Sequence, residues 1–140
     1  MAERMDAAAL NRFLGTEFTE VAGDFRVEAV TEQGVQVRLR VGPRHLRPGG
    51  TVSGPSIFAL ADVAVYLAIL SRIGPVALAV TTGSNVDFMR KPVAGVDLIA
   101  DCRLLKLGRV LAVGDVLVCS EGDPKPVARA AMTYSIPPRR

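Results

Sequence analysis

The stretch from Gly54 to Ile73 constrains the fold most, because it is apolar on nearly every side and contains one acid, Asp62, and one base, Arg72. A capping serine, Ser53, precedes it, a proline occupies its first turn, and a Gly-Pro pair follows it. These signals predict one long helix with defined ends. Because a helix without a polar face has to be wrapped by other structure, the rest of the chain must supply that cover.

Segments with alternating apolar and polar residues are the candidates for this cover. The alternation runs from Phe25 to Val30 and again from Val35 to Val41, with a Gln-Gly turn between the two runs. This pattern is typical of a hairpin with one solvated face. Four later strands are joined by short connections, which favour antiparallel neighbours and an α+β fold. We expect these strands at Val76–Met89, Val96–Leu105, Val110–Ser120 and Pro126–Ile136.

The length of 140 residues fits one compact domain, residues 1–140, in which residues 1–15 form an N-terminal helical extension that Gly15 ends. The most apolar part of the long helix, Pro55 to Leu70, is shorter than the about 20 residues that a membrane span needs. Acids near the N-terminus differ from the basic start of a signal peptide. We therefore expect a cytoplasmic protein without a membrane partner.

The amino-acid composition limits which partners and which reactive groups can be expected. Seventeen Lys and Arg against 14 Asp and Glu leave a net charge of +3, too small an excess to indicate a nucleic-acid partner. Cys102 and Cys119 lie in apolar stretches and are expected to be reduced core thiols. With His45 as the single histidine, no His/Cys metal cluster is expected, and a Ser-His-Asp triad would depend on that residue. Carboxylates, hydroxyls and backbone dipoles remain as the expected reactive groups.

The segment from His45 to Asp62, HLRPGGTVSGPSIFALAD, carries a more specific signal. It resembles the N-P-x-G-x-x-H-G-G-x-x-x-x-L-A-D motif of the PaaI-like acyl-CoA thioesterases. The resemblance extends over roughly Phe25 to Ile136 and implies the hotdog fold, an antiparallel sheet wrapped around one long central helix. Later landmarks of that family are similar to Asp87–Pro92, Leu107–Arg109 and Ala130–Tyr134.

The resemblance also implies an active site between two subunits. The motif glycine, Gly54, would polarise the thioester carbonyl with its N–H, and Asp62 of the other subunit would act as nucleophile or general base. The physics of the residues agrees, because a helix N-terminus favours a developing oxyanion and an aspartate inside an apolar helix is costly. No metal or cofactor is implied beyond the CoA thioester as substrate. The expected partner is a second copy in a homodimer, paired further into a homotetramer.

Three residues depart from the motif. Arg47 stands where the family has Asn or Gln, Ser53 replaces the histidine, and Pro55 replaces the second glycine. Arg47 leaves three interpretations open: it pairs with Asp62, it holds a substrate carboxylate, or it is a solvated loop cation. Arg47 and Ser53 are nevertheless kept as candidates for positioning the substrate.

The polar run from Val80 to Asp87 is unusual for a strand beside so apolar a helix. In the family, a Ser or Thr on this strand helps to hold the carboxylate or the water. Thr81 aligns with that position, and Thr82 and Asn85 are further candidates. Ordinary strand threonines are the alternative, since β-branching alone suits a strand.

Two basic turns are candidates for binding the phosphates of CoA. The first contains Arg90 and Lys91, and the second contains Lys106, Gly108 and Arg109. Solvated turn cations are the plainer interpretation of either turn alone.

The sequence therefore predicts an acyl-CoA thioesterase that converts acyl- or aryl-CoA thioesters to the free acid and CoA. The departures at Arg47 and Ser53 leave open a domain that binds acyl-CoA without hydrolysing it. A hydro-lyase acting on 3-hydroxyacyl thioesters is a third possibility, which would require His45 beside Asp62. A histidine that only packs in its loop is the plainer interpretation of His45.

Overall fold

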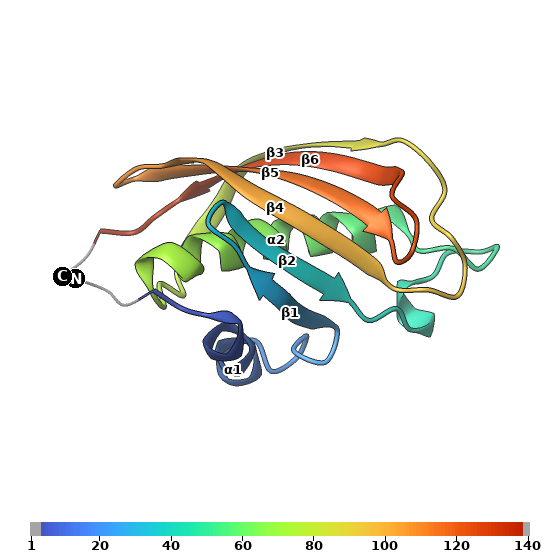
Figure 1. The fold of residues 1–140 in the computed structure, drawn as a ribbon, viewed down its shortest axis with the longest axis horizontal. Helices are drawn as coiled ribbons and strands as arrows, with labels where there is room; N and C mark the ends of the chain where they lie inside the picture. Colours follow the sequence, from blue (N-terminus) through green and yellow to red (C-terminus); the bar gives the residue numbers. More distant parts are fainter. Residues whose placement is uncertain (1–3, 139–140) are drawn as a thin grey trace.

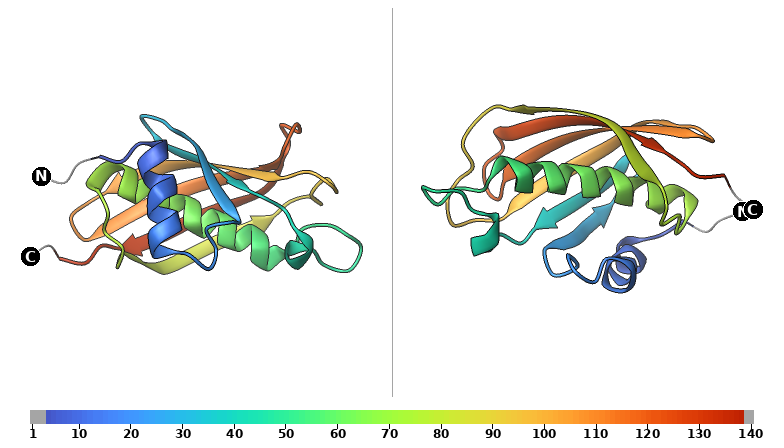
Figure 2. Two further views of the ribbon diagram at one scale, coloured as in Figure 1. Left: turned by 90° about the horizontal axis from the view of Figure 1, so that it is seen from below. Right: turned by 180° about the vertical axis from the view of Figure 1, so that it is seen from behind.

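A computed structural model describes residues 4–138 as a six-stranded sheet that wraps around helix α2 (Gly54–Ile73). Figure 1 shows the sheet in front of α2, and the view from behind in Figure 2 shows α2 lying along its concave face. The strand order is β1-β2-β4-β5-β6-β3, and every pairing is antiparallel. The expected hotdog fold is confirmed. The other elements are α1 (Ala7–Glu17), β1 (Phe25–Val30), β2 (Gly34–Leu39), the 3-10 helix η1 (Pro43–His45), β3 (Val80–Phe88), β4 (Leu98–Leu107), β5 (Leu111–Ser120) and β6 (Pro126–Ser135).

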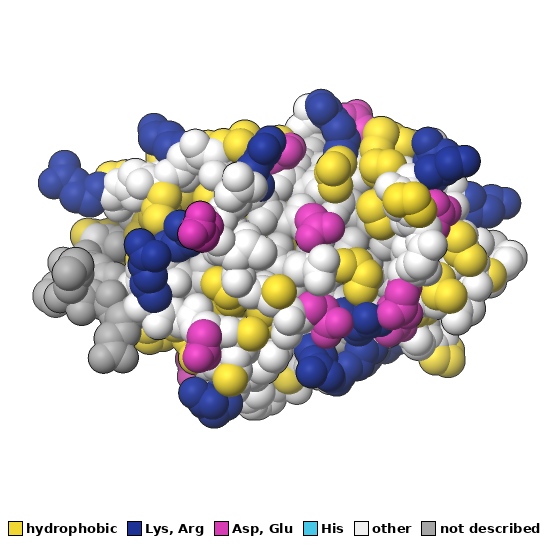
Figure 3. Space-filling view, in the orientation of Figure 1, with side chains coloured by type: hydrophobic (Ala, Val, Ile, Leu, Met, Phe, Trp, Pro, Cys, Tyr) yellow, Lys and Arg dark blue, Asp and Glu magenta, His cyan; other side chains and the backbone are white. Residues whose placement is uncertain are grey.

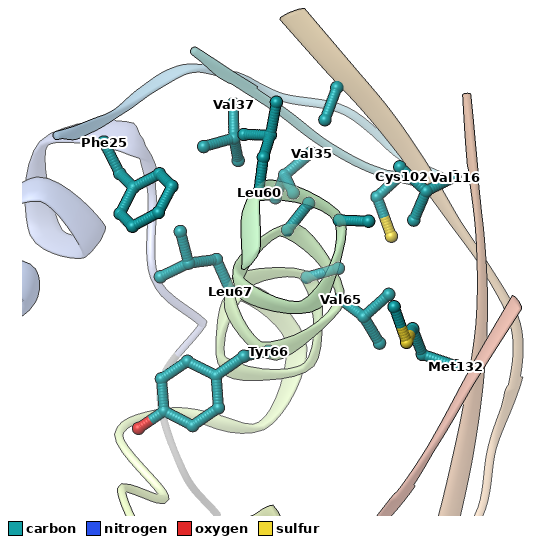
Figure 4. Close-up of a cluster of buried hydrophobic side chains, with 14 of the residues drawn as sticks. Phe25, Val35, Val37, Leu60, Val65, Tyr66, Leu67, Cys102, Val116 and Met132 are labelled. Atoms are coloured by element: carbon teal, nitrogen blue, oxygen red, sulfur yellow. The ribbon is translucent and has the colours of Figure 1, made fainter. Parts of the chain in front are cut away.

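Helix α2 has the predicted ends. The Ser53 hydroxyl accepts a hydrogen bond from the Ser56 N–H at 3.3 Å, and Gly74 ends the helix with a φ of 90°. Side chains from the strands surround the helix, as Figure 4 shows for Val37, Cys102 and others. Although α2 is long and apolar enough to cross a membrane, 61% of its apolar window is buried inside this fold. It therefore serves here as the core helix.

Two glycines allow close packing. A Cβ on Gly114 of β5 would lie 2.9 Å from both methyl carbons of Val65, so the missing side chain lets α2 lie against the middle of the sheet. A Cβ on Gly34 of β2 would lie 1.9 Å from the carbonyl oxygen of Cys102. Neither position has room for a larger residue.

The structure corrects two boundaries. Helix α1 continues through Gly15 to Glu17, where the Phe18 N–H donates to the Leu14 carbonyl; Gly15 lacks a Cβ but keeps its backbone donor and acceptor, so it weakens the helix without ending it. The strand expected from Val76 starts only at Val80, because the preceding residues form a turn in which the Ala79 N–H donates to the Val76 carbonyl.

The place of β3 in the sheet also differs from the expectation of sequential neighbours. Strand β3 pairs with β6 at the far edge, whereas β4 pairs with β2 and β5. The connection over residues 89–97 is too long for a tight hairpin and carries the chain across to β2. As a result, β3 is an edge strand that leaves one side unpaired by the described residues.

The outer face of the sheet is charged. Figure 3 shows Lys and Arg side chains interspersed with Asp and Glu over this face. Arg38 forms ion pairs with three acids there, and these hydrogen bonds raise its pKa. The paired acids are Glu28, Asp97 and Glu121. The buried apolar side chains lie on the opposite, concave face, around α2.

Candidate active site at Asp62 and Gly54

Asp62 lies in the middle of α2 with one carboxylate oxygen held and the other free. Its Oδ1 accepts hydrogen bonds from the Thr81 hydroxyl at 2.6 Å and from the Tyr134 hydroxyl at 2.8 Å. Within residues 4–138, no hydrogen bond or ion pair engages Oδ2. The carboxylate is therefore fixed in orientation and presents a single unpaired oxygen.

Tyr134 is a site residue that the sequence left without a role. Burial raises its pKa, and the charge of Asp62 raises it further, so the hydroxyl stays protonated and can donate. The β3–β6 register places Thr81 directly opposite Tyr134. That juxtaposition is the signal that could have identified Tyr134, and it becomes visible only once β3 is known to pair with β6.

A β-bulge aims Thr81 at Asp62. The register of β3 against β6 shifts between Thr81 and Gly83, which leaves Thr82 as the extra residue. The Thr82 hydroxyl donates instead to the Thr133 carbonyl at 3.3 Å and is exposed, as is Asn85. Of the three candidates on this strand, the structure brings only Thr81 to the carboxylate.

Asp62, Thr81 and Tyr134 line an apolar cavity of about 350 Å³. Phe18 and Tyr66 belong to its further lining. Burial raises the pKa of Tyr66 to about 12, and its hydroxyl donates to the Ala77 carbonyl at 3.0 Å. Asp62 thus borders a space suited to an apolar group.

A second cavity, of about 480 Å³, lies at the N-terminus of α2. The cations Arg47, Arg90 and Lys91 line it together with Gly54 and Phe88.

Gly54 offers an unpaired donor at this cavity. The next residue, Pro55, has no N–H, and Ser53 accepts the two N–H groups that follow. The Gly54 N–H has no hydrogen-bond partner in the described part of the chain. An unpaired N–H at a helix N-terminus beside three cations suits a developing negative charge and an anionic ligand.

The two cavities form separate half-sites within one chain. Gly54 and Asp62 are eight residues apart. A helix rises about 1.5 Å per residue, so about 12 Å of α2 separates them, too far for both to contact one carbonyl group. Arg47 lies in the Gly54 half-site and Thr81 in the Asp62 half-site. The pairing of Arg47 with Asp62, one of three open interpretations, is therefore not made within the chain.

The second basic turn lies at the opposite end of α2. Gly108 and Arg109 border a cavity together with Ile73, the last residue of the helix, and Lys106 lies beside Gly108. A 20-residue helix is about 30 Å long, so this turn is far from the cavity at Gly54. One chain does not bring the two sets of CoA-binding candidates together.

His45 is buried in the loop before α2 rather than paired with Asp62. Its Nδ1 accepts the Gly42 N–H at 2.8 Å, and its Nε2 lies 3.4 Å from a carboxylate oxygen of Asp24. Arg44 pairs with the same carboxylate. Desolvation lowers the pKa of His45, and the charge of Arg44 lowers it further. The His45–Asp62 pair that a hydro-lyase would need is absent from residues 4–138 of one chain.

The thiols are poor nucleophiles. Burial, with the charge of Asp115, raises the pKa of Cys102 to about 12, and burial also raises the pKa of Cys119. No group of three or more His, Cys, Asp or Glu side chains within the described residues is arranged to hold a metal ion.

The chain is similar in sequence and in fold to proteins of the thioesterase superfamily. The family model of the thioesterase superfamily matches residues 49–127. A crystal structure of a "putative thioesterase" from Silicibacter sp. TM1040 is 55% identical, with a TM-score of 0.91, over 99% of this chain and 96% of that one. A mutant structure of the phenylacetic acid degradation protein PaaI from Thermus thermophilus is 31% identical, with a TM-score of 0.72, over 85% and 99%. A "hypothetical thioesterase protein" with coenzyme A from Streptococcus pneumoniae is 19% identical and shares the fold, with a TM-score of 0.76, over 91% and 98%.

Proposed function

The chain belongs to the thioesterase superfamily, and on that premise we propose that it hydrolyses acyl- or aryl-CoA thioesters to the free acid and CoA. The observation that carries this proposal is the unpaired Oδ2 of Asp62, a residue that lines an apolar cavity. Thr81 and Tyr134 hold the other oxygen, so Oδ2 is the atom that acts on the substrate.

The reaction needs an oxyanion donor as well as a carboxylate. Oδ2 of Asp62 either attacks the thioester carbon, giving an anhydride that water hydrolyses, or takes a proton from the attacking water. In both routes the C–S bond breaks and CoA leaves as the thiolate, which is then protonated. The N–H of Gly54 stabilises the negative charge on the carbonyl oxygen.

The separation of Gly54 from Asp62 supports a site built by two copies of the chain. The unpaired edge strand β3 is the surface through which the copies would pair in a homodimer, with a dimer of dimers as the larger assembly. Apolar side chains are exposed on and beside this strand: Val80 and Phe88 are each 56% exposed, and Leu78, in the turn before β3, is 77% exposed. In such a dimer, Asp62 of one copy would act with Gly54 of the other.

Cations at the Gly54 half-site support CoA as the leaving group. Arg47, Arg90 and Lys91 would attract its phosphates. One protein that shares the fold was crystallised with coenzyme A.

The experiment that tests this function is to incubate the protein with a panel of acyl- and aryl-CoA thioesters and to follow free thiol. Hydrolysis releases thiol in proportion to the acid formed. Binding without thiol release would support the non-catalytic acyl-CoA-binding domain, which the departures at Arg47 and Ser53 leave open. Loss of water from a 3-hydroxyacyl thioester would support the hydro-lyase. Either result would contradict the proposed thioesterase activity.

A further inference from the structure

Helix α1 is held firmly against the rest of the molecule. Its Asn11 side chain makes two hydrogen bonds to the backbone of Val27 in β1, accepting the N–H at 2.8 Å and donating to the carbonyl at 3.1 Å. Leu10, Phe13 and Leu14 are buried beneath it. The views in Figure 2 show α1 lying beside β1. The helix is therefore a fixed part of the core and not a loose extension.

The C-terminal end of α1 and the residues that follow it form one wall of the cavity that Asp62 also lines. Leu14, Phe18 and Val21 line this wall. The Phe18 ring meets the Tyr66 ring edge to face, with centroids 5.4 Å apart and planes at 84°. Figure 4 shows Tyr66 leaving α2 on the side away from the Val35 and Val37 side chains of β2.

A row of three rings connects this wall to the carboxylate. The Tyr66 ring lies 6.2 Å from the Tyr134 ring, whose hydroxyl donates to Asp62. Tyr66 is tethered by its own hydrogen bond to Ala77. Phe18 is 39% exposed and is the outermost ring of the row. A change in the size of this ring would therefore change the space at this wall of the cavity.

The cavity's volume and charge limit what can occupy it. Its volume of about 350 Å³ is roughly twice that of an engineered 150 Å³ cavity that holds benzene. No Lys, Arg or His side chain lines it, and its one carboxylate is that of Asp62. Glu17 is close enough to act electrostatically on Tyr66. Within the described residues of one chain, this cavity therefore offers no positive charge to a second carboxylate on the acyl group.

We propose that Phe18, at the end of α1, bounds the acyl pocket, so that the preferred substrates carry an uncharged acyl group of medium length or an arylacyl group. This inference rests on the proposed thioesterase function. Phe18 is the residue that limits acyl length, and helix α1 is the element that holds it in place.

The test is the dependence of kcat/KM on acyl length for the wild type, Phe18→Ala and Phe18→Trp. Straight-chain CoA thioesters from acetyl to palmitoyl, with phenylacetyl-CoA and succinyl-CoA, form the series. Burial of each additional methylene raises kcat/KM about fourfold until the pocket is full. Phe18→Ala should move the optimum to chains longer by about two to four methylenes, and Phe18→Trp should move it to shorter chains. Succinyl-CoA should be the poorest substrate of its length.

Leu117→Ala is the matched control, because Leu117 on β5 is similarly exposed, at 44%, and does not line the cavity. Its length profile should match that of the wild type. Thermal unfolding of each variant checks its fold, and Phe18→Leu provides a milder truncation that should shift the optimum in the same direction as Phe18→Ala. If the wild type releases thiol but every Phe18 variant keeps the same length optimum, the Phe18 inference is wrong and the thioesterase function stands. If the wild type releases no thiol from any thioester, the proposed function itself is wrong.

Discussion

Asp62 combines two requirements that usually conflict, stability in an apolar helix and an available oxygen. Burial of a carboxylate is costly unless hydrogen bonds compensate. The hydroxyls of Thr81 and Tyr134 both donate to Oδ1, which supplies that compensation on one side of the group. Because both donors use the same oxygen, the other stays free for chemistry.

Asp62→Asn should lower kcat about 10²- to 10⁴-fold, the range expected for loss of a positioned acid–base group. The amide oxygen can still accept the hydrogen bonds from Thr81 and Tyr134, so the melting temperature should change little. Thiol release and thermal unfolding measure the two effects. A variant that keeps near-wild-type kcat would remove Asp62 from the mechanism.

Tyr134→Phe should lower kcat about 10- to 100-fold and leave KM within about twofold, since a hydrogen bond to a charged group contributes about 1.5–3 kcal/mol and both partners of this hydroxyl, Oδ1 and the backbone carbonyl, belong to Asp62. Tyr66→Phe is the matched control, because that hydroxyl donates to the backbone of Ala77. It should leave kcat close to the wild-type value. Equal losses of kcat in the two variants would show that Tyr134 has only a structural role.

Single site residues could be identified from the sequence, but the pairing that places Tyr134 opposite Thr81 could not. Asp62 and Gly54 could be identified because each is unusual where it stands, an acid inside an apolar helix and a glycine at that helix's entry. Tyr134 occupies an ordinary inward position of a strand, so nothing local marks it. Its role follows from the β3–β6 register, a long-range property that periodicity does not encode.

Among the elements, the loop before α2 is sensitive to pH through His45. In the folded protein the neutral ring accepts the Gly42 N–H, and desolvation with the charge of Arg44 lowers its pKa from the ordinary value of 6.5. Between pH 6.5 and the lower pKa of the folded state, the unfolded chain therefore binds a proton at His45 that the folded chain does not bind. The stability from neutral His45 is fully present above 6.5 and is lost as the pH falls toward the lower folded pKa.

The free energy of unfolding should therefore decrease between about pH 7 and pH 5.5, a window in which no other side-chain type normally titrates. His45→Gln should flatten this slope, because His45 is the single histidine in the chain. Urea unfolding at a series of pH values measures both proteins. An unchanged slope in the variant would contradict the assignment of this pH dependence to His45.

Substitutions at two glycines should have opposite effects, because Gly114 lies in the tight contact between α2 and the sheet and Gly15 lies on an open part of α1. Gly114→Ala places a methyl group against Val65 and should destabilise the fold by about 1–3 kcal/mol through overpacking. Gly15→Ala in α1 meets nothing within 4 Å and should stabilise the fold by about 0.5–1 kcal/mol through helix propensity. Urea unfolding of both variants tests this, and a neutral Gly114→Ala would mean that α2 has room to move away.

The elements that could be predicted are those with strong local patterns. Helix α2 and strands β4 to β6 appear close to their expected positions, because caps, alternation and turn residues mark them. Strand β3 was expected within Val76–Met89, but its place in the sheet could not be predicted, since its partner β6 is distant in the sequence. Because β3 carries Thr81, its pairing with β6 also decides which residue lies opposite Thr81 at the site.

For the whole molecule, the central claim is that one active site takes two copies of the chain. It rests on the distance along α2 between Gly54 and Asp62 and on the unpaired edge of β3. A symmetric dimer would then hold two sites, each with Asp62 from one copy and Gly54 from the other.

Mixing two inactive variants tests this claim most directly. Asp62→Asn lacks the carboxylate, and Gly54→Pro lacks the backbone donor, with Gly54→Ala as the control that keeps the N–H. In a mixed dimer, one of the two sites regains an intact Asp62 and an intact Gly54. After unfolding and refolding together in equal amounts, the mixture should recover about a quarter of wild-type activity, because half of the dimers are mixed and each of these has one good site. A mixture that forms mixed dimers yet stays as inactive as its parents would contradict a site shared between two chains.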